Sequence, residues 1–403
     1  MKCKFSGSKI RPFMTFGKMP IANGFLRKKD FNKEFFYEMK VGFNTKFSLF
    51  QLDDHPNPKK MFHNNYPFYT SSSKFMIEHF RKYAIWSKKF LRSNSKIIEL
   101  GSNDGTFLKN FNNSSINAIG FEPSKNVSDV AIKRGVKSIN QFFSINSIEN
   151  LKNHKANTDL ICGANVVCHI PEIKNLFYCI HKLLSKEGVF VFEEPYLGSV
   201  FKKTSYDQIY DEHIYLFSAI AIQKISSEFD LKLIAAIPQQ THGGSMRYVV
   251  CRKKSKRKIS KNLTKIIDSE KKINLDNEKF CEEFKLNCEI SKRRLRNKLI
   301  SLKNNNKKIC GYAATSKSTT ILNYCNINKD LIDYITDTTP EKIGRYTPGS
   351  HIPIIDYKLF MKKKPDIAVL FAWNHRKEIF KKEKKFKLGG GKWLTFFPNI
   401  KTW

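Results

Sequence analysis

The feature that most constrains the fold is an alternation of short apolar runs with helical stretches in the middle of the chain. Apolar residues recur at helical spacing from Phe75 to Leu91, and strand-like runs follow at 96–100, 118–121, 160–164 and 188–192. Such alternation is typical of a doubly wound parallel sheet with helices on both faces. The sequence therefore predicts an α/β fold for this part of the chain.

A second, shorter series of this kind begins at Lys308, which predicts a smaller Rossmann-like α/β domain at the C-terminal end. The segment before it lacks Gly and Pro and mixes Lys, Glu, Asn and Leu, as amphipathic linking helices do. The first 74 residues show short apolar runs broken by Gly, Pro and Asn. We therefore expect a small N-terminal domain at 1–74, the main α/β domain at 75–252, linking helices at 253–307 and the second α/β domain at 308–403.

Lys and Arg exceed Asp and Glu by 36, and these basic residues are spread along the whole chain. No nucleic-acid-binding motif accompanies them, so we expect a solvated basic surface and no nucleic-acid partner. Such a surface attracts small anionic substrates. No run approaches the roughly 20 apolar residues of a membrane span, and the nine cysteines lie mostly in apolar runs. We expect reduced thiols, a cytoplasmic protein without a membrane partner, and a monomer or weak homo-oligomer.

The first predicted strand runs into a loop in which glycines bracket three polar residues. Glycine allows the backbone to pass close to a ligand, and a helix expected from Thr106 would offer free N–H groups. The spacing resembles the methyl-donor loop of class I methyltransferases rather than a dinucleotide loop, which implies S-adenosylmethionine (SAM) as cofactor. Glu122 at the end of the next strand is placed to bind a ribose diol. The alternative interpretation is that the loop is an ordinary glycine turn and that Glu122 is an acid on the surface. The predicted cofactor-binding residues are Glu99, Gly101, Ser102, Asn103, Asp104, Gly105, Glu122 and Asn165.

Further polar residues follow the ends of later strands, where ligands bind in open sheets. Asn165 and His169 follow one strand, and Glu194 and Tyr196 follow another. The segment 206–218 then combines Tyr, acidic residues and His with little apolar period. Taken alone, a histidine such as His169 is more often a packed structural residue, and a segment such as 206–218 is more often a polar surface loop.

The segment Tyr206–Ser218 resembles the signature of the sugar C-methyltransferase family, whose members methylate a ring carbon of thymidine-diphosphate-linked keto-sugars. Similar stretches occur in the expected order at 241–247, 311–314, 322–325, 337–354 and 372–374. The resemblance implies a class I methyltransferase sheet, a second Rossmann-like domain, a small N-terminal domain and a nucleotide-linked sugar as substrate. It also implies that His213 is the general base, with Glu212 and Tyr210 completing the site.

The chemistry of the residues agrees with this implication. A carbon beside a ketone loses its proton only to a positioned base, with groups that hold the enolate charge. His213 alone in its segment titrates near neutrality. Tyr210, His169 and Tyr66 are predicted to donate hydrogen bonds to the enolate oxygen. Two alternatives stay open: an O- or N-methyltransferase, and a non-catalytic protein that binds sugar nucleotides.

The resemblance implies that the C-terminal domain helps to hold the sugar nucleotide. The turn 311–319 is rich in hydroxyls and carries Lys317, which suits phosphate, although a packing-only role is the alternative. The predicted substrate-binding residues are Glu194, Tyr196, His242, Gly243, Arg247, Lys317, Asn323, Arg345 and His351.

The chain departs from the family at two places. Family members hold zinc with two Cys-x-x-Cys pairs near the N-terminus, whereas this chain has Cys3 with Ser6, and then Asn44 and Phe47. One thiolate cannot hold a structural zinc, so we predict no metal. Asp211 replaces a common His beside the base, and we expect an acid there to favour protonated His213 and raise its pKa.

Overall fold

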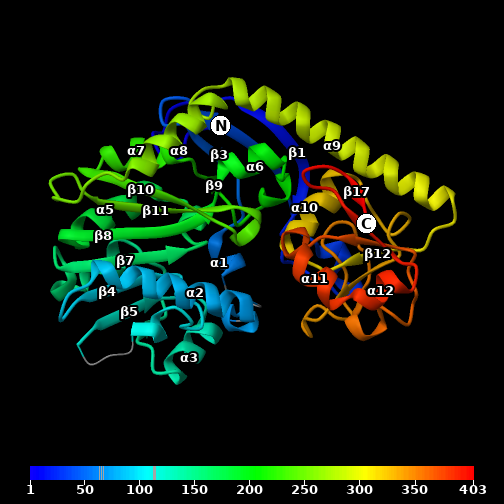
Figure 1. The fold of residues 1–403 in the computed structure, drawn as a ribbon, viewed down its shortest axis with the longest axis horizontal. Helices are drawn as coiled ribbons and strands as arrows, with labels where there is room; N and C mark the ends of the chain where they lie inside the picture. Colours follow the sequence, from blue (N-terminus) through cyan, green and yellow to red (C-terminus); the bar gives the residue numbers. More distant parts are fainter. Residues whose placement is uncertain (63, 65, 67, 112–114) are drawn as a thin grey trace.

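A computed structural model describes residues 1–403 except 63, 65, 67 and 112–114. Within that part of the chain the strands form three sheets, of four, seven and six strands. The seven-stranded sheet and the six-stranded sheet lie on opposite sides of the molecule, and the N-terminal strands lie between them (Figure 1). None of the helices described is long and apolar enough to cross a membrane.

The seven-stranded sheet is the predicted doubly wound sheet, in the order β10-β11-β8-β7-β4-β5-β6. The strands from β8 to β6 pair in parallel, and β11 is inserted antiparallel between β8 and β10. The order reverses direction between β4 and β7, which opens a crevice at their carboxyl ends. The strands are β4 (Lys96–Leu100), β5 (Asn117–Phe121), β6 (Ser138–Ile139), β7 (Thr158–Ala164), β8 (Leu184–Pro195), β10 (Leu231–Gln239) and β11 (Ser245–Arg252).

Apolar faces on the flanking helices cover this sheet. In α5 the residues Ile173, Leu176, Phe177 and Ile180 are buried at the three- and four-residue spacing of one helix face. The helices of this part are α2 (Lys74–Ser87), α3 (Lys125–Lys133), α4 (Ile145–Glu149), α5 (Ile173–Leu183), α6 (Leu197–Lys203) and α7 (Ala219–Ser227). The sequence correctly predicted a class I α/β architecture with several domains.

The N-terminal sheet takes its last strand from a distant part of the chain. It contains β1 (Pro12–Pro20), β2 (Phe36–Asn44), β3 (Leu49–Leu52) and β9 (Tyr215–Leu216) in that order. Phe50 pairs with Leu216 in antiparallel register. Because β9 directly follows His213, the N-terminal sheet holds one end of the segment 206–218.

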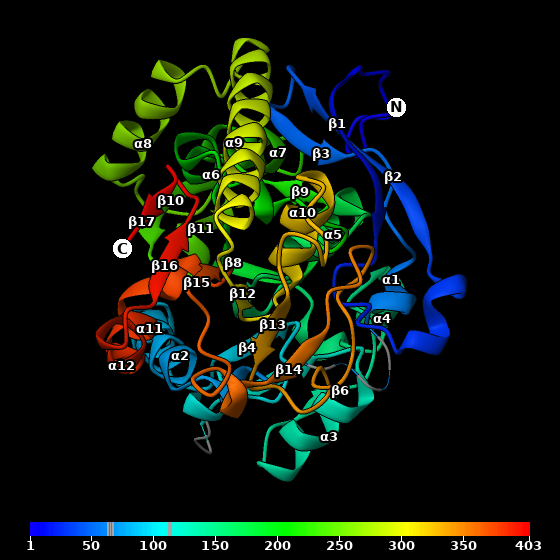
Figure 2. The ribbon, with the colours of Figure 1, turned by 90° about the vertical axis from the view of Figure 1, so that its right-hand side faces the viewer.

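The C-terminal sheet has the order β14-β13-β12-β15-β16-β17 and is parallel except at β17. The long helix α9 runs from the seven-stranded side to this sheet (Figures 1 and 2). The strands are β12 (Ile309–Tyr312), β13 (Tyr334–Asp337), β14 (Ile354–Asp356), β15 (Ile367–Leu370), β16 (Lys392–Thr395) and β17 (Lys401–Thr402). The remaining helices are α1 (Pro58–Met61), α8 (Lys261–Lys272), α9 (Lys279–Asn304), α10 (Ser316–Tyr324), α11 (Arg376–Lys382) and α12 (Lys384–Leu388).

A single hydrophobic core joins the N-terminal strands, α9 and the C-terminal domain. It includes Phe16 and Val41 from the N-terminal sheet, Phe280 and Leu295 from α9, and Ile321 from α10. Apolar burial on this scale fixes the relative positions of these parts. The C-terminal domain is therefore held firmly opposite the crevice of the seven-stranded sheet.

Candidate functional site

A large cavity lies at the crevice of the seven-stranded sheet and reaches the C-terminal domain. It encloses about 1010 Å³, and the residues that line it lie at 23, 57–59, 62, 66, 68–70, 72–73, 76, 80, 99–103, 106–107, 121–123, 142–144, 164–166, 169–172, 210, 212–213, 242, 315–317, 338–342, 371–372 and 374–375. Ligand pockets commonly span about 300–1,000 Å³. The volume of this cavity lies at the upper end of that range.

The predicted cofactor loop forms one end of this cavity. Gly101 has φ +61°, and a Cβ there would lie 2.9 Å from Val166 Cγ2. Glu122 accepts hydrogen bonds from the main-chain N–H groups of Asn103 at 3.0 Å and Ser124 at 2.8 Å. One oxygen of buried Glu99 has no partner within the described residues, and burial raises the pKa of its carboxyl. Ser102 and Asn165 also carry unpartnered buried oxygens here. This polar, close-fitting cradle suits the aminoacyl and ribose parts of SAM.

The helix expected from Thr106 is absent, and a short 3-10 helix (Leu108–Phe111) stands in its place. The side-chain amide of Asn110 donates to the carbonyl oxygens of Thr106 and Phe107, which are groups that an α-helix would use. Asp104 and Gly105 lie outside the cavity lining. Asp104 instead pairs with Arg134 at 3.1 Å and accepts from the main-chain N–H of Ser71.

Glu194 lies behind the cavity and holds the loop after β7. Its Oε1 accepts from the main-chain N–H groups of Val166 at 3.1 Å and Val167 at 2.7 Å. Burial raises the pKa of Glu194 to about 7. Asn165 and His169, which flank this anchored turn, both line the cavity. Glu194 therefore positions the loop and does not line the cavity.

His213 and Tyr210 form a hydrogen-bonded pair in the middle of the cavity lining. His213 Nδ1 lies 2.6 Å from the carbonyl oxygen of Gln208, and Nε2 lies 3.0 Å from the Tyr210 hydroxyl. A carbonyl only accepts, so Nδ1 carries the proton and Nε2 accepts from Tyr210. Burial, with the nearby His169 and Lys317, holds the pKa of His213 well below its ordinary value. The imidazole is therefore neutral, with a basic Nε2.

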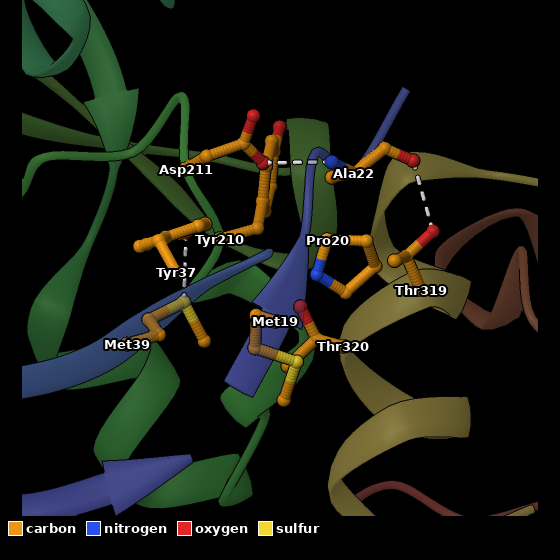
Figure 3. Close-up of a pocket in the computed structure, with 9 residues that line it drawn as sticks. All are labelled: Met19, Pro20, Ala22, Tyr37, Met39, Tyr210, Asp211, Thr319 and Thr320. Atoms are coloured by element: carbon orange, nitrogen blue, oxygen red, sulfur yellow. Dashed lines mark hydrogen bonds between the residues drawn. The ribbon is translucent and has the colours of Figure 1, made fainter. Parts of the chain in front are cut away.

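The expectation that Asp211 raises the pKa of His213 is wrong. Oδ1 of Asp211 accepts from the main-chain N–H of Ala22 in the N-terminal domain at 3.0 Å (Figure 3), and burial lowers the pKa of His213. Burial raises the pKa of Asp211, and the charge of neighbouring Glu212 adds to this shift. Glu212 itself lines the cavity and accepts from Asn23 at 2.7 Å.

His169 and Tyr66 complete the predicted catalytic set, and both line the cavity. The rings of His169 and His213 lie 5.4 Å apart. Burial lowers the pKa of His169 to about 3, and its Nε2 has no partner within the described residues. A neutral imidazole of this kind can donate to a developing oxyanion.

Two of the predicted substrate-binding residues, His242 and Lys317, line the cavity. Burial lowers the pKa of Lys317 to about 8, and Asp207 opposes this shift. The lining near Lys317 also includes Thr315 and Ser316 of the predicted hydroxyl-rich turn, and Lys342, which the sequence reasoning missed. These groups offer two cations and two hydroxyls, a set that suits phosphate.

The other predicted substrate-binding residues do not line the cavity, and two of them contact acidic side chains elsewhere in the fold. Arg247 pairs with buried Glu193 at 2.6 Å, and His351 lies 2.7 Å from Glu34 of the N-terminal domain. The remaining residues outside the cavity lining are Glu194, Tyr196, Gly243, Asn323 and Arg345.

Aromatic residues at the cofactor end were also missed by the sequence reasoning. Phe68, Phe80, Phe142 and Phe143 line the cavity near Glu122. The adjacent phenylalanines at 142 and 143, a few residues after β6, were the available signal. Flat apolar side chains of this kind suit an adenine ring.

The sheet order, the glycine cradle and the acid at the end of β5 define a SAM-dependent methyltransferase. Three family models match consecutive parts of the chain: "Putative zinc binding domain" at 3–62, "Methyltransferase domain" at 75–236 and "C-methyltransferase C-terminal domain" at 240–398. Together these three models cover nearly the whole chain, in the domain order of a C-methyltransferase. The C-methyltransferase NovU of Streptomyces niveus is 26% identical over 388 residues, which cover 96% of this chain and 92% of NovU.

Two solved structures are similar to part of this chain. A SAM-dependent methyltransferase of Thermotoga maritima, described as a possible histamine N-methyltransferase, is 16% identical, with TM-score 0.35, and covers 44% of this chain and 92% of its own. A SAM-dependent methyltransferase of Clostridium acetobutylicum is 14% identical, with TM-score 0.33, and covers 44% of this chain and 92% of its own. The fold assignment rests on the sheet order, and these two similarities add nothing to it.

The residues of the N-terminal domain do not fit a zinc ion. At the family's four ligand positions, Ser6 N–H donates to Cys3 Sγ at 3.4 Å, and the amide of Asn44 donates to Ser6 Oγ at 3.4 Å. Phe47 packs against Phe5 with ring centroids 4.5 Å apart. A structural zinc needs about four ligands, whereas this cluster offers one thiolate.

A second group of potential ligands lies beside the cavity. Atoms of Cys168, His169 and His213 that can bind a metal lie within 4.8 Å of one another. Both ring nitrogens of His213 already take part in hydrogen bonds, and Cys168 is outside the lining. We therefore assign no metal to this group.

Proposed function

We propose that this protein transfers a methyl group from SAM to a ring carbon beside the ketone of a nucleotide-linked keto-sugar, with His213 as the general base. The observation that carries the proposal is the neutral imidazole of His213, whose basic Nε2 lines the cavity. A general base must be deprotonated at the working pH and within reach of the proton that it takes.

Bound SAM supplies an electrophilic methyl group on a sulfonium. The hydroxyl of Tyr210 turns from His213 Nε2 to the substrate carbonyl oxygen, and Nε2 then takes the proton from the adjacent carbon. His169 and Tyr66 donate to the oxygen on which negative charge develops. The carbanion held in this way would accept the methyl group that bound SAM supplies, and His213 would later release its proton to water.

The proposed substrate class is supported by the opposite end of the cavity. Lys317 and Lys342 line this end of the cavity together with the hydroxyl groups of Thr315 and Ser316, and Glu341 is an acid beside them. A diphosphate bound there places the attached sugar between the C-terminal domain and His213. The cavity volume of about 1010 Å³ admits this substrate beside SAM.

The test incubates the protein with SAM labelled in its methyl group and a panel of thymidine- and other nucleotide-linked 4-keto-sugars. Carbon-13 NMR of the product is expected to show the label on a ring carbon. Label on oxygen or nitrogen would instead establish an O- or N-methyltransferase. If calorimetry shows no SAM binding and a nucleotide sugar binds, the protein is a binding protein without catalysis.

A further inference from the structure

A two-residue segment of the N-terminal domain lies between the catalytic segment and the C-terminal domain. On one side, Ala22 N–H donates to Asp211 at 3.0 Å and Asn23 Nδ2 donates to Glu212 Oε1 at 2.7 Å. On the other side, two hydroxyls of α10 bind the same residues: Ser316 Oγ donates to Asn23 Oδ1 at 2.9 Å, and Thr319 Oγ1 donates to Ala22 O at 2.9 Å. Figure 3 shows the Asp211, Ala22 and Thr319 part of this arrangement.

We infer that Asn23 is a positioning residue for Glu212 and connects this carboxylate to the first turn of α10. The inference rests on the proposed function and on the family resemblance, which implies that Glu212 completes the catalytic site beside His213. Asn23 lies about 190 residues from Glu212 and about 290 from Ser316 along the chain, so only the folded N-terminal domain brings the three together.

The chemistry of the amide explains why this position suits asparagine. Its NH₂ group donates to a carboxylate and its carbonyl oxygen accepts from a hydroxyl at the same time. Aspartate in its place would offer no donor to Glu212 and would add a second negative charge. Alanine would leave both Glu212 and Ser316 without this partner.

Glu212 depends on this contact because little else neutralises it. Among the described residues, Asn23 is the hydrogen-bond partner of its carboxylate, and the side chain is 5% exposed. The titratable groups around it are Asp211, Tyr210, Tyr66 and Cys168, none of which is a cation. A lone donor to a buried carboxylate contributes strongly to the stability of its ionised form.

The contact with Ser316 gives the same residue a second role. Ser316 precedes Lys317, and both line the cavity where the nucleotide is proposed to bind. Asn23 thus links the nucleotide end of the cavity with the carboxylate beside His213. The position of Asn23 is therefore fixed by its contacts with Ser316 at one end of the substrate site and with Glu212 at the other.

The experiment compares Asn23→Ala, Asn23→Gln and Asn23→Asp with Thr319→Val, which removes the Ala22 contact of the same segment and leaves the Asn23 amide in place. Asn23→Ala is expected to lower kcat by roughly 10- to 100-fold, the usual effect of losing a hydrogen bond to a charged group. SAM affinity by calorimetry should stay within about threefold, because Asn23 lies away from the cofactor loop. Activity should rank Gln above Ala and Ala above Asp.

A pH profile separates positioning from a general structural role. Without its donor the Glu212 carboxylate is harder to ionise, so the acid limb of kcat should move to higher pH in Asn23→Ala and stay in place in Thr319→Val. Profiles and kcat values of the Asn23 variants that match Thr319→Val would overturn the inference. A fully active Glu212→Gln enzyme would overturn the role of Glu212 in the proposed function instead, whatever the Asn23 variants show.

Discussion

The Nδ1 atom of His213 lies 2.6 Å from the main-chain carbonyl oxygen of Gln208. This contact fixes the proton on Nδ1 and leaves Nε2 as the basic nitrogen, 3.0 Å from the hydroxyl of Tyr210. Gln208 and His213 belong to one short segment, which is held at one end by the N-terminal sheet through β9. The orientation of the His213 imidazole, the proposed base, is therefore set by backbone geometry rather than by a carboxylate.

Replacing His213 with alanine removes the proposed base and should lower kcat at least about 100-fold, within the usual contribution of general base catalysis. SAM binding by calorimetry should be unchanged because His213 lies outside the cofactor loop. His55→Ala is the matched control, since its ring binds the carbonyl of its neighbour Pro56 and does not line the cavity. Transfer that survives His213→Ala at the wild-type rate would remove His213 from the mechanism.

Replacing Tyr210 with phenylalanine tests the proposed donor to the enolate oxygen. The change deletes one hydroxyl and should lower kcat by roughly 10- to 100-fold, as loss of an oxyanion donor does. The effect should fall on kcat more than on KM because the donor acts when charge develops. Tyr178→Phe, at a side chain 42% exposed on α5, is the control and should behave as wild type. Equal kcat values in the two variants would contradict the proposal.

The sequence located those parts of the site in which a polar residue directly follows the strand that positions it. Gly101, Asn103 and Glu122 follow the ends of consecutive strands, so the parallel sheet brings them to one edge. The same reasoning located Asn165 and His169 after β7. For these residues a local pattern was enough.

Residues whose partners come from distant segments could not be located in this way. Arg247 was expected to bind substrate, yet it pairs with Glu193 and lies against the rings of Tyr83 and Trp86. His351 likewise stacks on Phe31 of the N-terminal domain, at 3.8 Å. The residues next to Arg247 and His351 in the sequence do not indicate these partners. The direction of the pKa shift of His213 was misjudged because the sequence does not reveal that this imidazole is buried.

Lys317 gives a test of the substrate class that does not involve the base. Lys317→Met should raise KM for a nucleotide-linked sugar by roughly 10- to 100-fold, since a buried cation is lost from an anion site, and should leave SAM affinity unchanged. Lys387→Met, at an exposed position of α12, is the control. In the wild type the affinity for the nucleotide should fall as the pH rises through about 8, because Lys317 loses its charge there. Equal KM values in the two variants would contradict the assignment.

The packing of Phe47 against Phe5 predicts an N-terminal domain that is stable without metal. A chelator should leave the melting temperature unchanged, and elemental analysis should find less than stoichiometric zinc. Phe47→Ala should lower the free energy of unfolding by about 3 kcal/mol, the cost of truncating a buried phenylalanine. Phe36→Ala, at a side chain 42% exposed in β2, should cost far less. One equivalent of zinc per chain would show that the cluster binds metal despite its single thiolate.

Glu270 of α8 provides a test of the fold through the pH dependence of stability. Its carboxylate accepts from the first main-chain N–H groups of α7, those of Ala219 at 2.7 Å and Ile220 at 2.9 Å. Burial raises the pKa of Glu270 from 4.5 to about 7 in the folded chain.

An acid with a raised folded pKa binds its proton more tightly in the folded than in the unfolded state. Its contribution to stability is therefore full below about pH 4.5 and is lost as the pH rises through about 7. The free energy of unfolding of the wild type should fall by roughly 1–3 kcal/mol more than that of Glu270→Gln between about pH 5 and pH 7.5. Urea titrations at each pH measure this difference, and Glu228→Gln, at an exposed acid just after α7, should keep the wild-type slope. If Glu270→Gln also keeps that slope, the buried acid does not hold its proton into the neutral range, and the contact between α8 and α7 is an ordinary charged cap.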